Sequence, residues 1–175
     1  MKKILLISGS LREKSTNTAL LRAFETELQE KATVTWGNIE LPLFNEELEE
    51  QFPTAAETLK QQILAADAVI IATPEYNRGM SGVLKNAIDW TSRPYGQSAW
   101  TGKKVLVAAA SPGGIAGALA VYQVKQSLLH LDAQVFGQPE FMVGGAPQKF
   151  DEAGTLTDSV TKDQIVLTVE LLLHN

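Results

Sequence analysis

The sequence contains no cysteine and only two histidines among its 175 residues. The absence of thiols excludes disulfides, thiolate catalysis and metal sites with cysteine ligands. The two histidines, His130 and His174, lie in a predicted helix and near the C-terminus, where we expect them to be structural or solvated. The sequence therefore offers no convincing catalytic triad, and we expect no metal site.

Basic residues and long apolar runs are also scarce. The 15 lysines and arginines are outnumbered by 20 acidic residues, which gives a net charge of −5. Sequence-independent nucleic-acid binding requires a basic face, so nucleic acid is not an expected partner. The first apolar run covers only residues 4–7, too short for a signal peptide, and no other run approaches a membrane span. We expect a cytoplasmic protein with no membrane partner.

What the sequence does contain is typical of a soluble globular protein, with 45% hydrophobic and 20% charged residues. A chain of this length is most simply one domain, spanning residues 1–175, and it is long enough to bury a core.

Strand-like and helix-like patterns alternate along the chain. Strands are predicted at residues 2–8, 33–41, 67–73, 103–111 and 132–143, the last interrupted near Gly137 and Pro139. Helices are predicted at residues 16–30, 54–66, 82–91, 116–131 and 157–174, and Thr54 with Glu57 has the form of a capping box. This alternation predicts an α/β fold in which helices cover both faces of a doubly wound, five-stranded parallel sheet of order 2-1-3-4-5.

Three loops are then expected at one edge of the sheet. In this fold, ligands bind at the carboxyl ends of the strands, beside the point where the strand order reverses. The loops that reach this point are residues 8–17, 74–82 and 111–117, and all three are rich in glycine or small polar residues.

The first loop lacks the glycines of a P-loop or of a G-x-G-x-x-G turn, since Gly9 stands alone. It offers hydrogen-bond donors instead, at the entrance to a helix whose first N–H groups and dipole favour an anion. These donors are Ser10, Arg12, Ser15, Thr16 and Asn17. They predict a phosphate site, and the alternative is that Ser15 or Thr16 only caps the helix while Arg12 is solvated.

The second and third loops suit a flat heterocycle. Pro74 ends the third strand, Gly79 and Gly82 permit close backbone approach, and Tyr76 and Asn77 offer an aromatic surface and an amide. Ser111-Pro-Gly-Gly could form another wall of the same crevice. The alternative is that these segments are ordinary polar turns.

Three segments carry a resemblance to a known family: GSLREKSTN at residues 9–17, ATPEYNRGMSGVLKNAIDWTSRP at residues 72–94 and ASPGG at residues 110–114. They resemble the signature segments of the NAD(P)H-dependent FMN reductase family. This flavodoxin-like family includes bacterial quinone, azo-dye and chromate reductases. The resemblance extends over nearly the whole chain.

The resemblance implies a site for FMN. It assigns the FMN phosphate to Ser10, Arg12, Ser15 and Asn17 and the isoalloxazine ring to the backbone of Pro74, Glu75, Tyr76 and Asn77, with Ser111 and Gly113 at the far wall. It implies an oxidoreductase that passes hydride from NADPH or NADH through FMN to quinones, chromate, azo compounds or free flavin. The chemistry belongs to FMN, so no catalytic side chain is expected.

The alternative to this oxidoreductase function is a flavodoxin-type electron carrier without NAD(P)H turnover. The resemblance also implies a homodimer or homotetramer. Leu119 stands where some relatives have an arginine, and Arg78 stands where many have a small or uncharged residue. No basic cluster marks a 2′-phosphate site, and Arg78 is the one candidate to read that phosphate. Arg93 and Trp100 either cover a neighbouring subunit's flavin or close the fourth strand, and Asp89 bonds nearby backbone or a partner subunit rather than pairing with Glu75.

Overall fold

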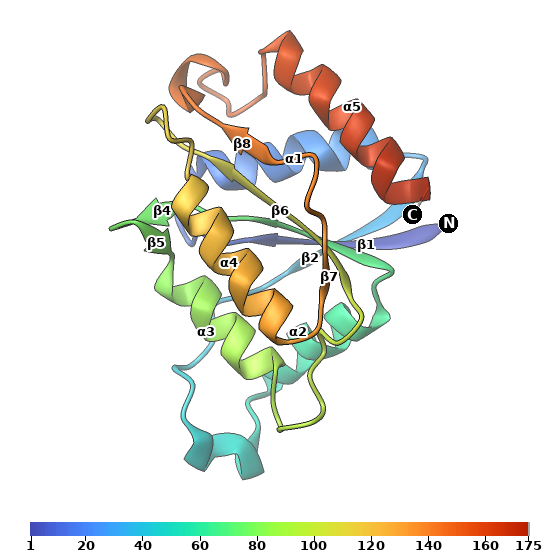
Figure 1. Cartoon of the computed structure of the whole chain (residues 1–175), viewed down its shortest axis with the longest axis vertical. Coiled ribbons are helices and arrows are strands. Elements are labelled where there is room, and N and C mark those ends of the chain that lie inside the picture. Colours follow the sequence, from blue (N-terminus) through green and yellow to red (C-terminus); the bar gives the residue numbers. More distant parts are fainter. Residues whose placement is uncertain (175) are drawn as a thin grey trace.

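The computed structural model describes residues 1–174, in which six strands form one parallel sheet (Figure 1). The strand order is β2-β1-β3-β6-β7, and β8 also pairs with β6. These strands are β1 (Lys2–Ser8), β2 (Ala32–Gly37), β3 (Ala68–Ala72), β6 (Lys104–Ala110), β7 (Gln134–Val135) and β8 (Phe141–Val143). The predicted order is confirmed, with β7 and β8 as the two halves of the interrupted fifth strand.

The interruption of the fifth strand follows from its sequence. Lys104 pairs with Gln134 at one end of β6, and Ala108 pairs with Phe141 toward the other. Gly137 and Pro139 lie between the two halves. Proline has no N–H group to donate to a ladder, so pairing stops there and resumes beyond it.

Five α-helices cover the two faces of the sheet: α1 (Thr16–Leu28), α2 (Thr54–Ala65), α3 (Gly82–Thr91), α4 (Ala118–His130) and α5 (Ser159–His174). Alternate side chains of β1 point to opposite faces. Ile4 and Leu6 pack in the core beneath α1 and α5, whereas Leu5 and Ile7 pack in the core beneath α2, α3 and α4. The three-layer arrangement is visible in Figure 1.

The second strand is shorter than predicted. β2 ends at Gly37, and the chain then crosses to α3 instead of extending to residue 41. The Asn86 side chain accepts a hydrogen bond from the Phe44 N–H group and donates one to the Pro42 carbonyl, and Trp90 also donates to Pro42. The side chains of α3 thus satisfy backbone groups of the segment that follows β2.

Short elements were not predicted. The hairpin of β4 (Glu75–Tyr76) and β5 (Gly79–Met80) is too brief for an alternating pattern, and η1 (Glu46–Gln51) and η2 (Ala146–Gln148) are short 3₁₀ helices. The capping box at Thr54 was a wrong prediction. Pro53 is the N-cap of α2, without a side-chain cap bond, and Thr54 is already helical.

The connector after α3 packs against its own chain, as the strand-closing alternative predicted, and coverage of a neighbouring subunit's flavin stays a prediction. Trp100 is 1% exposed, and its indole N–H group donates to the Thr91 hydroxyl. Arg93 pairs with Glu46 and Glu49 of η1. Arg93 also lies past the C-terminal end of α3, whose other end carries the second loop.

A carboxylate at the start of α5 makes a testable contribution to stability. Asp158 accepts hydrogen bonds from the Thr161 hydroxyl at 2.6 Å and from the Thr161 N–H group at 2.9 Å. These bonds hold the pKa of Asp158 below its usual value, with a smaller contribution from Lys149. A carboxylate with a lowered pKa stabilises the fold above its unfolded pKa, and this stabilisation is lost as the pH falls through the folded pKa.

We therefore expect Asp158→Asn to lower the melting temperature at about pH 7 and to have less effect once the pH has fallen below the lowered pKa of Asp158, where the wild-type carboxylate is protonated. Thermal melts at several pH values would check this. Asparagine keeps an acceptor for the Thr161 N–H group. A difference in melting temperature that does not change with pH would therefore contradict a role for the charge.

Candidate functional site

The first and second loops meet at the carboxyl ends of β1 and β3. The Gly9 N–H group donates to the Ala72 carbonyl at 2.7 Å, and the Ser81 hydroxyl donates to the Gly9 carbonyl at 2.5 Å. Ser81 is also the N-cap of α3 and accepts a hydrogen bond from the Leu84 N–H group. One buried side chain thus fixes the first loop to the start of α3.

Gly9 is required by this close approach. A Cβ atom at Gly9 would lie 3.1 Å from the Ala72 oxygen, 3.1 Å from Pro74 Cδ and 3.2 Å from Leu84 Cδ2. These distances are shorter than ordinary van der Waals contacts. The lone glycine of the first loop therefore serves the packing of two loops against each other.

The predicted phosphate donors lie at the start of α1. Ser15 is the N-cap and accepts a hydrogen bond from the Thr18 N–H group, as the capping alternative predicted. Thr16 is the first residue of α1. Ser10 accepts a hydrogen bond from the Arg12 N–H group, and the exposed Arg12 guanidinium donates to the Lys14 carbonyl. The first N–H groups of a helix have no intrahelical partner. Ser15 accepts a bond from only one of them, that of Thr18, so this helix end is still suited to an anion.

Asn17 differs from the other predicted donors because its side chain is already bound. The Asn17 amide donates to the Ala110 carbonyl at 3.1 Å and accepts from the Ala110 N–H group at 2.8 Å. β3 ends at Ala72, opposite Ala108, so Ala110 lies beyond the last residue of β3. The Asn17 amide binds the backbone of Ala110, which lies beyond the residues of β6 that pair with β3. It thereby joins the first loop to the end of β6, where the third loop begins.

The second loop forms the β4–β5 hairpin. Asn77 and Arg78 both have positive φ, at 50° and 66°, which is the signature of a two-residue type I′ turn. Pro74 is buried, whereas Tyr76 is half exposed. A hollow of about 340 Å³ brings the first two loops together, and it is lined by Gly9, Ser10, Leu11, Arg12, Tyr76 and Val83.

The third loop follows β6, the strand next to β3 in the sheet. The Ser111 N–H group donates to the Val143 carbonyl, and the Ser111 hydroxyl accepts a weak hydrogen bond from the Gly113 N–H group. Gly113 is exposed. Neither Ser111 nor Gly113 lines the hollow between the first two loops, so their place in the site stays a prediction.

The third loop is joined to the second by a side chain. The Glu75 carboxylate accepts hydrogen bonds from the Leu119 and Ala120 N–H groups in the first turn of α4, at 3.1 and 3.3 Å. Its other oxygen lies 3.5 Å from Arg78 Nη1. Glu75 is therefore committed to a helix end and is not part of a carboxylate pair.

Other residues considered from the sequence lie outside this site. Asp89 forms an ion pair with Lys85 one turn earlier in α3 rather than the expected bond to nearby backbone, and the expected partner-subunit bond stays a prediction. His130 and His174 are exposed, as expected. No helix among residues 1–174 is long and apolar enough to cross a membrane.

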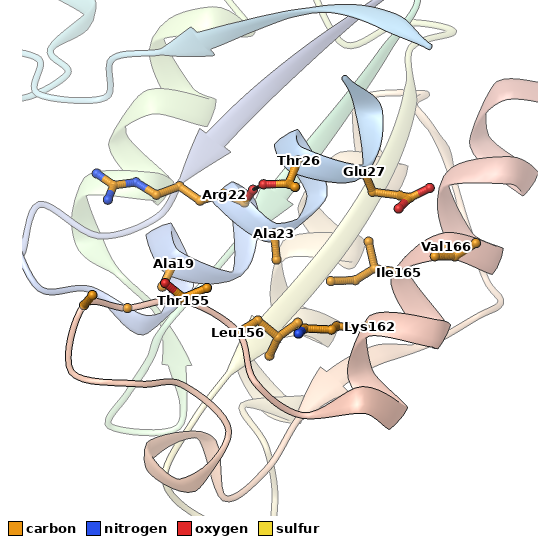
Figure 2. A pocket seen from close by; sticks show the side chains of 12 residues that line it. Ala19, Arg22, Ala23, Thr26, Glu27, Thr155, Leu156, Lys162, Ile165 and Val166 are labelled. Atoms are coloured by element: carbon orange, nitrogen blue, oxygen red, sulfur yellow. Dashed lines mark hydrogen bonds between the residues drawn. The ribbon is translucent and has the colours of Figure 1, made fainter. Parts of the chain in front are cut away.

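A second hollow, of about 410 Å³, lies between α1 and α5 (Figure 2). No motif or residue pattern indicated a site here. Its α1 side is lined by Arg22, Thr26, Glu27 and the small side chains Ala19 and Ala23, which leave a gap between α1 and α5. Figure 2 shows the Arg22 guanidinium directed away from this gap. We attribute the hollow to small residues at a helix–helix contact.

Two residues that build the site were missed in the sequence. The side chains of Ser81 and Gln123 bind backbone groups of the loops, at Gly9 and Met80. Ser81 directly precedes a predicted helix and so carried an N-cap signal. Gln123 lies within a helix and carried no local signal.

The close approach at Gly9 gives a direct test. We expect Gly9→Ala to lower the free energy of unfolding by about 1–3 kcal/mol, because the added methyl overpacks the contact with Ala72, Pro74 and Leu84. Urea denaturation would measure this. Gly82→Ala is the matched control, since a Cβ atom there meets nothing within 4 Å. Equal effects of the two substitutions would contradict the packing role.

Comparisons with known proteins agree with this geometry. The chain is 43% identical over 157 residues to a quinone reductase of Pseudomonas putida, covering 89% of this chain and 84% of that protein. It is 41% identical over 172 residues to an NAD(P)H-dependent FMN reductase of Pseudomonas aeruginosa, covering 97% and 92%.

A solved structure and a family model extend the likeness to the fold. The structure of FerB, a flavoenzyme NAD(P)H:(acceptor) oxidoreductase from Paracoccus denitrificans, matches with a TM-score of 0.92 and 34% identity, covering 99% of this chain and 96% of that chain. The family model described as NADPH-dependent FMN reductase matches residues 2–148, which include all three loops. The chain therefore belongs to the NADPH-dependent FMN reductase family.

Proposed function

We propose that this protein is an oxidoreductase that takes electrons from NADPH or NADH and passes them, through bound FMN, to a quinone. The observation that carries the proposal is the meeting of the phosphate-type donors of the first loop with the β4–β5 hairpin around one hollow. The relatives named quinone reductase and NAD(P)H-dependent FMN reductase support the same activity. Chromate, azo compounds and free flavin are further candidate acceptors.

The residues of the first loop fit the terminal phosphate of FMN. Ser10 and Arg12 line the hollow, and the first turn of α1 adds the hydroxyl of Thr16 and backbone N–H groups. The positive end of the helix dipole and the Arg12 guanidinium both favour an anion. Ser15 serves through its place as N-cap. Asn17 would contribute its backbone N–H group, because its amide is bound to Ala110.

The second and third loops fit the ring. We assign Pro74, Glu75, Tyr76 and Asn77 to the isoalloxazine through backbone groups and the Tyr76 surface, and Ser111 and Gly113 to the opposite wall. Bound FMN supplies the redox chemistry, because its ring exchanges hydride or electrons with both substrates. The chain binds and orients the reactants, and no side chain of the site is required as an acid or base.

The alternative of a flavodoxin-type electron carrier is the weaker one. The compared proteins are named as reductases that use NAD(P)H or reduce quinones, and these are enzymes rather than carriers. The hairpin that follows β3 lies within the matched region and within the segment whose resemblance favours the reductases.

We also propose that the protein is a cytoplasmic homodimer or homotetramer. Exposed apolar side chains at the start of α4, Ile115, Leu119 and Tyr122, support self-association. The Tyr122 hydroxyl donates to Glu140 of the same chain at 2.8 Å, which raises the pKa of Tyr122. This bond forms within one chain. Leu119 stands where some relatives have an arginine, so the bond between Tyr122 and Glu140 does not need that arginine.

The activity can be tested with the purified protein. We expect yellow protein, or protein that becomes yellow with added FMN, and NAD(P)H oxidation that accelerates when a quinone is added. Absorbance spectra and NAD(P)H oxidation rates would measure both. Yellow protein inert toward both nicotinamides would favour the carrier, and protein that cannot take up FMN would contradict both functions.

Arg78 gives a test of nicotinamide choice. Its side chain is 65% exposed and makes a long contact with Glu75, so it can reach a ligand in solvent. If Arg78 reads the 2′-phosphate, Arg78→Ala should raise the KM for NADPH about tenfold and leave that for NADH nearly unchanged, as expected for one charge-assisted pair. Equal changes for the two nicotinamides would reject this role.

A further inference from the structure

The first turn of α4 has a complete set of hydrogen-bond partners, and Glu75 supplies two of them. The Ala118 N–H group donates to the Ile115 carbonyl, and the Val121 N–H group begins the intrahelical ladder at Gly117. The two N–H groups between them, at Leu119 and Ala120, donate to Glu75. Glu75 lies more than 40 residues earlier in the chain, yet it caps the helix.

The helix has no room for a cap of its own. The N-cap residue is Gly117, with φ of 78° and no side-chain cap bond. A Cβ atom at Gly117 would lie 2.9 Å from the Ala109 Cβ atom of β6. Serine, threonine and aspartate, the usual N-cap residues, are therefore excluded at this position. The N–H groups of the first turn need an acceptor from another part of the fold.

A second contact joins the hairpin to α4, and here a side chain of α4 binds the backbone of the hairpin. The Gln123 side chain, one turn after the helix start, accepts a hydrogen bond from the Met80 N–H group at 2.7 Å. Gly79 makes room for it, because a Cβ atom there would lie 2.9 Å from Gln123 Oε1. Glu75 of β4 and Gln123 of α4 thus form a two-point clamp, one contact on each strand of the hairpin.

The hairpin needs such a clamp. β4 and β5 have two residues each, and they pair with each other rather than with the main sheet. An isolated hairpin, even a longer one, is marginally stable in water. Its position over the sheet therefore depends on side chains that bind it to neighbouring elements, and Glu75 offers two charge-assisted hydrogen bonds.

We propose that Glu75 is a positioning residue for the flavin ring. It holds the β4–β5 hairpin on α4 and keeps the backbone of Pro74–Asn77 in the geometry that receives the ring, without touching the ring through its carboxylate. This role rests on the proposed function, because it presumes that the hairpin binds FMN. The carboxylate also places a negative charge at the positive end of the α4 dipole.

The test separates the ring from the phosphate. Riboflavin has the ring of FMN but no phosphate, so its affinity reports the ring contacts without the phosphate site. We expect Glu75→Ala to weaken FMN and riboflavin by the same factor, about five- to tenfold, as expected for the loss of one helix cap. Glu75→Gln keeps an oxygen for the two N–H groups and should restore most of the affinity. Quenching of flavin fluorescence would measure both.

The same variants can be compared without flavin. In flavin-free protein, Glu75→Ala should speed amide hydrogen exchange at Leu119, Ala120 and Met80.

Asp158→Ala is the matched control, because it removes a carboxylate that caps α5 instead. It should leave the affinity for riboflavin unchanged. By contrast, Arg12→Ala should weaken FMN more than riboflavin.

Distinct outcomes would overturn the proposal. It fails if Glu75→Ala binds riboflavin as the wild type does, if exchange at Leu119 and Ala120 stays the same, or if Asp158→Ala weakens riboflavin equally. The proposed function fails separately if wild-type protein binds neither flavin. Exchange in flavin-free protein would still show in that case whether Glu75 holds the hairpin on α4.

Discussion

The two hydrogen bonds between the Asn17 amide and the Ala110 backbone hold the carboxyl edge of the sheet together. They pair backbone groups of β6 that lie beyond the end of β3, and a buried backbone group without a partner is costly. Because Asn17 lies in the first turn of α1, the same bonds set where that helix starts relative to β6. The direction in which the first N–H groups of α1 point therefore depends on the Asn17 side chain, which binds β6.

The other loops at this edge are held by the same kind of contact. Ser81 binds the Gly9 carbonyl, Glu75 binds N–H groups of α4, and Gln123 binds the Met80 N–H group. Irregular segments lack the continuous ladder of a strand, so side chains have to satisfy their backbone groups. Loops fixed in this way are already ordered before a ligand arrives, which lowers the entropy cost of binding.

The sequence predicted the strand order and the three loops because both depend on local patterns that are strong in this chain. Periodicity defined the helices, and the donors of the first loop were visible as residue types. The same residue types could not show which donors are engaged: Asn17 was expected to meet a phosphate, but its amide binds Ala110. The β4–β5 hairpin was missed because its strands are too short for an alternating pattern. The capping of α4 by Glu75 was missed because it depends on contacts across more than 40 residues.

The divided fifth strand has a consequence for the behaviour of the protein in concentrated solution. An unbroken edge strand presents a row of N–H and C=O groups that can pair with another molecule and start aggregation. At this edge β7 offers two residues and β8 three, and Pro139 lies between them. A strand of another molecule cannot pair with this edge over a long, straight segment. The break in the fifth strand therefore protects the protein from edge-to-edge aggregation.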